Sequence, residues 1–69
     1  MPSKYWRGLK PDKCQLCGRK LAQQFVDGRL RTTGQWAIVC PTCYHTHGSG
    51  FGLGRGQRYD LNTLEKVAG

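Results

Sequence analysis

The chain has 69 residues, which allow one small domain and exclude a large hydrophobic core. Eleven lysines and arginines against four acidic residues give a formal charge of +7, and ten glycines raise the entropy lost when the backbone is ordered. A chain of this kind needs a crosslink, and its four cysteines can supply a disulfide or a metal site. No segment is long and apolar enough to span a membrane as a helix.

Residues 1–11 predict a basic N-terminal arm. The arm lacks the apolar run of about 7 to 15 residues that a secretion signal requires, so we expect a cytoplasmic protein with reduced thiols. Residues 1–20 carry six basic side chains and one acidic side chain, which favours a polyanionic partner, although such charge can also serve solubility alone. Trp6 lies among these cations, as in a base-stacking platform beside phosphate contacts, or it covers the small core.

Residues 12–47 contain two C-x2-C pairs, Cys14-Gln15-Leu16-Cys17 and Cys40-Pro41-Thr42-Cys43, which are separated by 22 residues. This spacing is typical of paired zinc knuckles, in which each pair offers two thiolates and the second pair completes a tetrahedron. Gly18 supplies the positive φ that such a turn tends to require, and Pro41 fixes φ inside the second pair. We predict one structural Zn²⁺ bound by Cys14, Cys17, Cys40 and Cys43.

Other uses of these residues are less consistent with the pattern. A disulfide within one pair closes too short a loop to stabilise much, and disulfides between the pairs need an oxidising compartment. His45 and His47 are the remaining candidate ligands, but four thiolates already complete the coordination. That coordination leaves no position for a reactive water, and the four carboxylates form no recognisable acid-base pair. We therefore expect no enzyme activity and no small-molecule substrate.

The segment between the pairs predicts antiparallel strands. Residues 20–31 have the pattern strand, turn, strand, in which Asp27-Gly28 is a strong signal for a type I′ hairpin turn. Residues 35–39 are rich in β-branched and aromatic side chains and predict a strand that runs into Cys40.

The two knuckles and the strands between them resemble the zinc ribbon family over about residues 12–44. More narrowly, Phe25-Val26-Asp27-Gly28, Trp36, the second cysteine pair, the glycine tract and Gly56-Gln57-Arg58-Tyr59 resemble small zinc ribbon proteins of phages and other mobile elements. The resemblance implies a small metal-stabilised β fold with a structural zinc ion. It implies no particular function.

Residues 48–69 predict a glycine-rich tail followed by a short C-terminal segment. Glycine recurs at every second position from Gly48 to Gly56, a spacing that fits neither a Walker A loop nor a dinucleotide-binding loop. An extended tract of this kind has one bare face, so we expect it to pack flat on the ribbon with Phe51 and Leu53 as anchors and Tyr59 closing it, or to meet a nucleic-acid backbone. Residues 60–69 allow a short helix capped by Asn62, a strand, or a frayed end.

The expected function is that of a non-enzymatic zinc-binding module for nucleic acid, either DNA or RNA. Trp6 or Trp36 would stack on bases, and the cationic contacts expected for phosphates are Lys4, Arg7, Lys10, Lys13, Arg19, Lys20, Arg29, Arg31, Arg55 and Arg58. The alternative is a small adaptor or inhibitor that docks on a host protein through aromatic side chains or an open strand edge.

Overall fold

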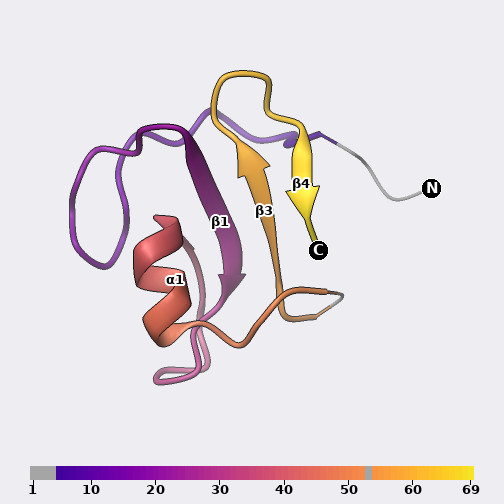
Figure 1. Ribbon diagram of the computed structural model, residues 1–69. Helices are drawn as coiled ribbons and strands as arrows, with labels where there is room; N and C mark the ends of the chain where they lie inside the picture. Colours follow the sequence, from indigo (N-terminus) through magenta and orange to yellow (C-terminus); the bar gives the residue numbers. More distant parts are fainter. Residues whose placement is uncertain (1–4, 53) are drawn as a thin grey trace.

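The computed structural model describes residues 5–52 and 54–69, which form a four-stranded antiparallel sheet and one short helix (Figure 1). The elements in chain order are β1 (Gln24–Arg29), β2 (Trp36–Val39), α1 (Pro41–His47), β3 (Gly56–Asp60) and β4 (Lys66–Ala68). The strand order in the sheet is β2-β1-β3-β4. The prediction of a small antiparallel β fold is confirmed. The segment 48–69, expected as a tail, supplies two of the four strands, and one of them is internal.

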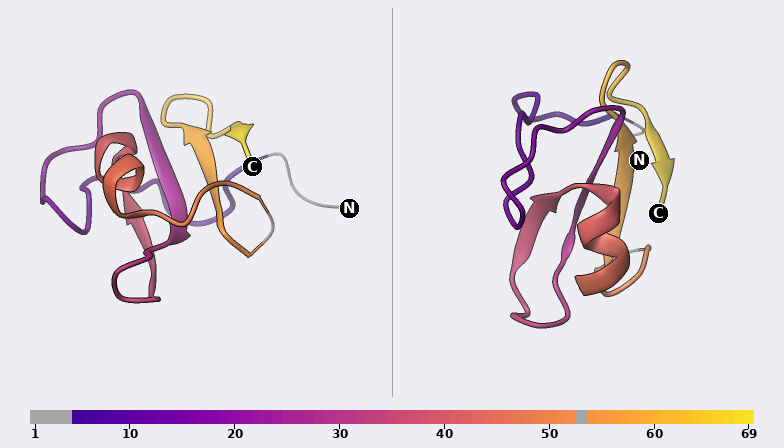
Figure 2. Two further views of the ribbon diagram at one scale, coloured as in Figure 1. Left: turned by 60° about the horizontal axis from the view of Figure 1, so that its bottom comes forward. Right: turned by 60° about the vertical axis from the view of Figure 1, so that its left-hand side comes forward.

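The two inner strands divide the hydrophobic residues between the two faces of the sheet. Val26 of β1 is paired with Val39 of β2, and both are fully buried on the face that α1 covers. Phe25 is paired with Tyr59 of β3, and their stacked rings lie 5.3 Å apart on the opposite face, because successive residues of a strand point to opposite sides. Figure 2 shows α1 and the amino-terminal segment on opposite sides of the sheet.

Trp6 covers the second face. Its ring meets Phe25 and Tyr59 edge-on, with centroid distances of 5.3 and 5.5 Å, and its backbone N–H donates to the Leu64 carbonyl at 2.8 Å. The indole N–H donates to the carbonyl of Leu9. Trp6 was expected either to stack on bases or to cover the small core, and in the structure it covers the core.

Tyr44 of α1 fills the centre of the first face and packs on three glycines. A Cβ atom added to Gly28, Gly48 or Gly56 would lie within 2.6 Å of an atom of this tyrosine, closer than side chains approach one another. The Tyr44 hydroxyl lies 2.5 Å from the Gly50 carbonyl oxygen and 2.8 Å from that of Arg55, and donates its proton to one of them. Glycine is therefore required at these positions by the aromatic ring.

The predicted hairpin turn at Asp27-Gly28 is wrong. Both residues lie inside β1, where Gly28 is paired with Ala37 and Gly56 and gives room to Tyr44. The turn comes later, at residues 30–35, where the Leu30 and Gln35 backbones bond and Gly34 has a φ of +72°. The strand predicted at residues 35–39 is confirmed as β2.

The extended strand predicted for the glycine tract is also wrong. Gly50, Gly52 and Gly54 have φ values of +90°, +128° and +74°, so the segment between α1 and β3 is a loop built on left-handed glycines. Phe51 packs against Tyr44 at a centroid distance of 5.2 Å and is 41% exposed. The second predicted anchor, Leu53, lies outside the described residues.

The C-terminal segment is a turn and a strand, so of the three alternatives expected for it the short helix and the frayed end are excluded. The Asp60 carboxylate accepts hydrogen bonds from the backbone N–H groups of Asn62 and Thr63, at 2.8 and 3.0 Å, which closes the turn. The chain then returns as β4 along β3, so the alternative of an added strand is confirmed.

Candidate metal centre

The first cysteine pair lies in a tight turn that directs backbone N–H groups toward sulfur. The N–H groups of Leu16 and Cys17 lie 3.4 and 3.5 Å from the Cys14 Sγ atom. Gly18 closes the turn by donating to the Cys14 carbonyl, and its φ of +75° confirms the role predicted for this glycine. Such N–H groups stabilise negative charge on sulfur.

The second pair lies where β2 passes into α1. Cys40 precedes the helix, Pro41 occupies its first turn, and Cys43 lies in the same turn. Proline fits this position because the first N–H groups of a helix have no intrahelical partner. The spacing predicted a knuckle here but not a helix, since a seven-residue helix has too little hydrophobic periodicity to be detected.

Gln15 connects the two cysteine pairs. Its backbone N–H donates to the Ile38 carbonyl, and its side-chain carbonyl accepts from the Ile38 N–H, both at 2.9 Å. These two bonds attach the first turn to the outer edge of β2, two residues before Cys40. The sequence contained no pattern from which this contact could be predicted.

The four Sγ atoms of Cys14, Cys17, Cys40 and Cys43 all lie within 4.8 Å of one another. The Cys17 and Cys40 sulfurs are 3.9 Å apart, far longer than the roughly 2.05 Å of a disulfide, and all four cysteines are free. A tetrahedral ion with metal–sulfur bonds of about 2.3 Å needs sulfurs about 3.8 Å apart. The predicted convergence of the two pairs is confirmed, and the cluster has the size that a metal ion requires.

The pKa values of two thiols in this cluster, Cys14 and Cys43, are shifted in opposite directions. Burial disfavours ionisation of Cys14, but hydrogen bonds from the backbone of Cys17, Cys40 and Leu16 outweigh it and lower its pKa to about 6. Burial, followed by hydrogen bonds and charge repulsion from the neighbouring cysteines, raises the pKa of Cys43 to about 12. Without a cation the cluster therefore resists carrying four negative charges, and a bound divalent cation would remove that resistance.

His45 and His47 lie on α1, outside this cluster. Within residues 5–52 and 54–69, the four cysteines are the one group of three or more histidine, cysteine or acidic side chains whose ligand atoms converge. His45 is exposed and His47 is half-buried. Beside the cluster, a groove of about 510 Å³ carries two cations, Arg19 and Lys20, on its wall.

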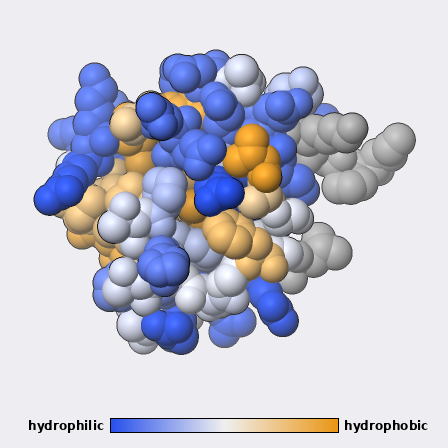
Figure 3. Space-filling model, viewed as in Figure 1, coloured by the Kyte–Doolittle hydropathy of each residue, from blue (hydrophilic) through white to orange (hydrophobic). Residues whose placement is uncertain are grey.

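The cationic residues expected to bind nucleic acid are spread over the surface. Arg58 is half-buried, Lys4 lies outside the described residues, and the exposed members of the set are Arg7, Lys10, Lys13, Arg19, Lys20, Arg29, Arg31 and Arg55. Hydrophilic residues gather at the upper left of Figure 3, over the segment before β1. Arg58 is paired with Val26 of β1, and Val26 and Arg29 point to opposite faces of that strand. Arg58 and Arg29 therefore lie on opposite faces of the sheet, and the expected cations do not form one continuous face.

One group of the expected residues does come together. Trp36 of β2 and Arg29 of β1 are direct partners in the β1–β2 ladder. On the other side of β1, the backbone N–H of Arg29 donates to the backbone carbonyl of Arg55, the residue directly before β3, at 2.8 Å. All three side chains are exposed, and the indole N–H of Trp36 donates to the Asp27 carboxylate. Burial raises the pKa of Asp27, and this hydrogen bond partly offsets the effect.

Comparison of the chain with protein-family models, with curated proteins and with solved structures gave no match. Within the described residues, no helix has both the length and the hydropathy needed to cross a bilayer. The arguments on function therefore depend on the geometry of the chain itself.

Proposed function

We propose that the protein is a zinc-ribbon-type module in which Cys14, Cys17, Cys40 and Cys43 bind one Zn²⁺. The support is the convergence of four sulfurs within 4.8 Å. Thiolate ligands favour Zn²⁺ over oxygen-preferring ions such as Mg²⁺ and Ca²⁺. Four thiolates fill a tetrahedral shell and leave no position for a reactive water, so the ion has a structural role and the module is not an enzyme.

Metal analysis of the purified chain tests this assignment. We expect one zinc ion per chain, and loss of stoichiometric zinc when Cys17 or Cys43 is replaced by serine. The matched control is His45→Asn, which changes an exposed residue of the same helix outside the cluster and should keep one zinc ion per chain. Full zinc retention by a Cys43→Ser variant, with loss in His45→Asn, would show that the ligand set is wrong.

We further propose that the module binds single-stranded nucleic acid through a surface defined by Trp36, Arg29 and Arg55, called here the Trp36 surface. The observation that carries this proposal is that exposed Trp36 of β2, exposed Arg29 of β1 and exposed Arg55, in the turn before β3, follow one another across the sheet. The Trp36 side chain is 48% exposed, and its N–H bond to Asp27 fixes the ring in place. An aromatic ring beside cations is the arrangement on which unpaired bases stack while phosphates are neutralised.

The charge of the chain supports the same proposal. The formal charge is +7, and no acidic side chain forms an ion pair with a lysine or arginine within the residues that the structure describes. The cations of the Trp36 surface are therefore available to phosphates. Binding of this type releases counterions, so its affinity falls steeply as salt rises.

Fluorescence anisotropy with single-stranded DNA and RNA oligonucleotides of mixed sequence, at several salt concentrations, tests the proposal. We expect log K to fall linearly with log salt, and Arg29→Gln to make the slope shallower by about one phosphate contact. The matched control is Arg7→Gln, which removes one exposed charge outside the Trp36 surface. Absence of affinity at about 50 mM salt contradicts the proposal.

A host protein is the second candidate partner, and one observation favours it. Leu9 is 95% exposed, more than any other large apolar side chain that the structure describes. A chain that binds no oligonucleotide but captures a host protein through Leu9, with loss of capture in Leu9→Ser, would have the adaptor function.

A further inference from the structure

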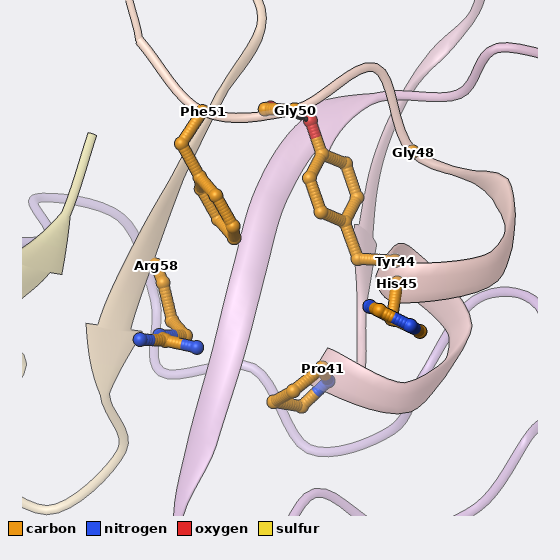
Figure 4. A pocket seen from close by; sticks show the side chains of 7 residues that line it. All are labelled: Pro41, Tyr44, His45, Gly48, Gly50, Phe51 and Arg58. Carbon is orange, nitrogen blue, oxygen red and sulfur yellow. Dashed lines mark hydrogen bonds between the residues drawn. The ribbon is translucent and has the colours of Figure 1, made fainter.

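A second concave site lies between α1 and β3, lined by residues distinct from the four thiols. It is a pocket of about 190 Å³, and Figure 4 shows Arg58 and Phe51 on one side of it and Pro41, Tyr44 and His45 of α1 on the other, with β1 passing behind. None of the side chains on its wall is acidic. No part of the metal site or of the Trp36 surface accounts for this pocket.

Arg58 is the side chain that gives the pocket its chemistry. Its guanidinium carbon lies 5.6 Å from the centroid of the Phe51 ring, so the ring supports the planar group from one side. Its Nε atom is shielded from solvent and has no hydrogen-bond partner. Because Nε is covered, a ligand in the pocket would meet the terminal N–H groups of the guanidinium, and the unfavourable unpaired Nε–H would gain an acceptor only through a shift of the side chain toward the ligand.

The opposite wall adds further donors and leaves room for a ligand. His45 carries an imidazole with an N–H group, and Gly48 and Gly50 complete the wall between it and Phe51. A Cβ atom added at Gly50 would meet no atom within 4 Å, so the absence of a side chain leaves this space open. A guanidinium presents parallel N–H groups that match two oxygens of one phosphate, and such bonds are about twice as strong as neutral ones.

We propose that this pocket binds a single phosphate group, held by the guanidinium of Arg58 and the imidazole N–H of His45. The phosphate belongs to a small ligand, such as inorganic phosphate or a nucleoside monophosphate, or to the end of a nucleic-acid strand. The pocket lies on the face of the sheet that α1 covers, and the Trp36 surface lies on the other. The proposal therefore does not rest on nucleic-acid binding by the Trp36 surface.

NMR titration of the metal-loaded chain with inorganic phosphate tests the proposal, with chloride added to keep the ionic strength constant. We expect the Arg58 Nε–H resonance to shift and saturate. Arg58→Lys, which keeps the charge but loses the planar fork, should bind at least about tenfold more weakly. His45→Asn should also weaken binding, and it leaves Arg58 and the fold intact because His45 is exposed.

Arg7→Gln is the control, because it removes one exposed charge outside the pocket and should leave phosphate affinity unchanged. Weaker binding in Arg7→Gln, together with unchanged binding in the charge-conserving Arg58→Lys, would reduce the effect to general electrostatics and overturn the proposal. Acetate binding as tightly as phosphate would overturn the ligand class. Tighter binding of a nucleoside monophosphate, or of a 5′-phosphorylated oligonucleotide, than of inorganic phosphate identifies the source of the group.

Discussion

Tyr44 is the residue on which the packing of the first sheet face depends. Its ring contacts glycines of β1, of the segment after α1 and of β3, which are Gly28, Gly48 and Gly56. Burial raises the pKa of its phenol, and a backbone hydrogen bond partly offsets this effect. A single side chain of the helix thus replaces the several apolar side chains that a larger protein would use to cover a sheet.

A methyl group at position 28 should therefore destabilise the fold. A Cβ there would lie 2.6 Å from the Tyr44 ring, so Gly28→Ala should cost about 1–3 kcal/mol, measured by chemical denaturation of the metal-loaded chain. Tyr44→Leu removes the ring that the methyl group meets. The double variant Gly28→Ala with Tyr44→Leu should be more stable than the sum of the two single effects by about 0.5 kcal/mol or more. Additive effects would show that the ring does not set the need for glycine.

Asp60 should make stability depend on pH in the acid range. Hydrogen bonds from the backbone of Thr63 and Asn62 lower its pKa below the ordinary 3.8. A carboxyl whose pKa is lower in the folded state stabilises the fold above the unfolded value, and this contribution is lost as pH falls through the folded value. The stability difference between wild type and Asp60→Asn should be constant above about pH 5 and shrink below pH 4. A difference that grows on acidification would contradict this prediction.

At the scale of elements, the sequence predicted the parts that follow local rules. The convergence of the two cysteine pairs, the turn at Gly18, the β2 strand and the antiparallel class follow from spacing and propensity. The hairpin prediction failed because Asp27-Gly28 has the sequence of a turn, but its glycine has another role. Gly28 leaves room for the Tyr44 ring of α1. Gly28 alone cannot distinguish these two uses, since both need the absence of a side chain.

The glycine tract illustrates the same limit. Alternation predicted a strand with one bare face, but Gly50, Gly52 and Gly54 use their freedom to adopt positive φ, and the extended strand begins only at Gly56. The phosphate pocket could not be predicted from the sequence either, because it forms only where Arg58 of β3 lies opposite His45 of α1. Which helix covers which face of a sheet is a tertiary property that periodicity does not contain.

The two tryptophans should respond differently to substitution because they belong to different structures. Trp6 closes the second face against Phe25 and Tyr59, so Trp6→Ala should cost about 2–3 kcal/mol of folding stability. Trp36 is half exposed, and Trp36→Ala should cost about 1 kcal/mol of stability through its bond to Asp27. It should weaken oligonucleotide binding by about 1–3 kcal/mol for each base stacked.

Denaturation and anisotropy measured on the same two variants check this division. A folded Trp6→Ala chain with much weaker oligonucleotide binding, beside an unaffected Trp36→Ala chain, would place the stacking site on the N-terminal arm. The tryptophans would then have the reverse of the roles proposed.

At the scale of the whole molecule, the chain is compact although its core is small. The radius of gyration is 10.8 Å, against about 11 Å expected for a globular chain of this length. Among residues 5–52 and 54–69, the largest fully buried side chains are Phe25, Val26 and Val39. A core of this size supplies about 3–5 kcal/mol at most, whereas a structural zinc site contributes about 10–16 kcal/mol of binding free energy.

Removal of the proposed zinc ion should therefore unfold the chain. Addition of a strong chelator should abolish the dispersion of the NMR spectrum, and addition of Zn²⁺ should restore it. Protons compete with the metal for thiolates, so zinc affinity should fall as pH falls, and more chelator should be needed as pH rises. A chain that keeps its dispersed spectrum after complete removal of metal would contradict a structural role for the ion.

The helix α1 has one further property that follows from its shortness. Cys43, Tyr44 and His45 are consecutive, and an α-helix rotates about 100° per residue, so these side chains project in three directions, to the thiol cluster, the glycine-lined core and the phosphate pocket. The three environments thus share a single turn of backbone that is ordered or disordered as a unit. Zinc and phosphate should consequently bind with positive cooperativity, each raising the affinity for the other by the same factor.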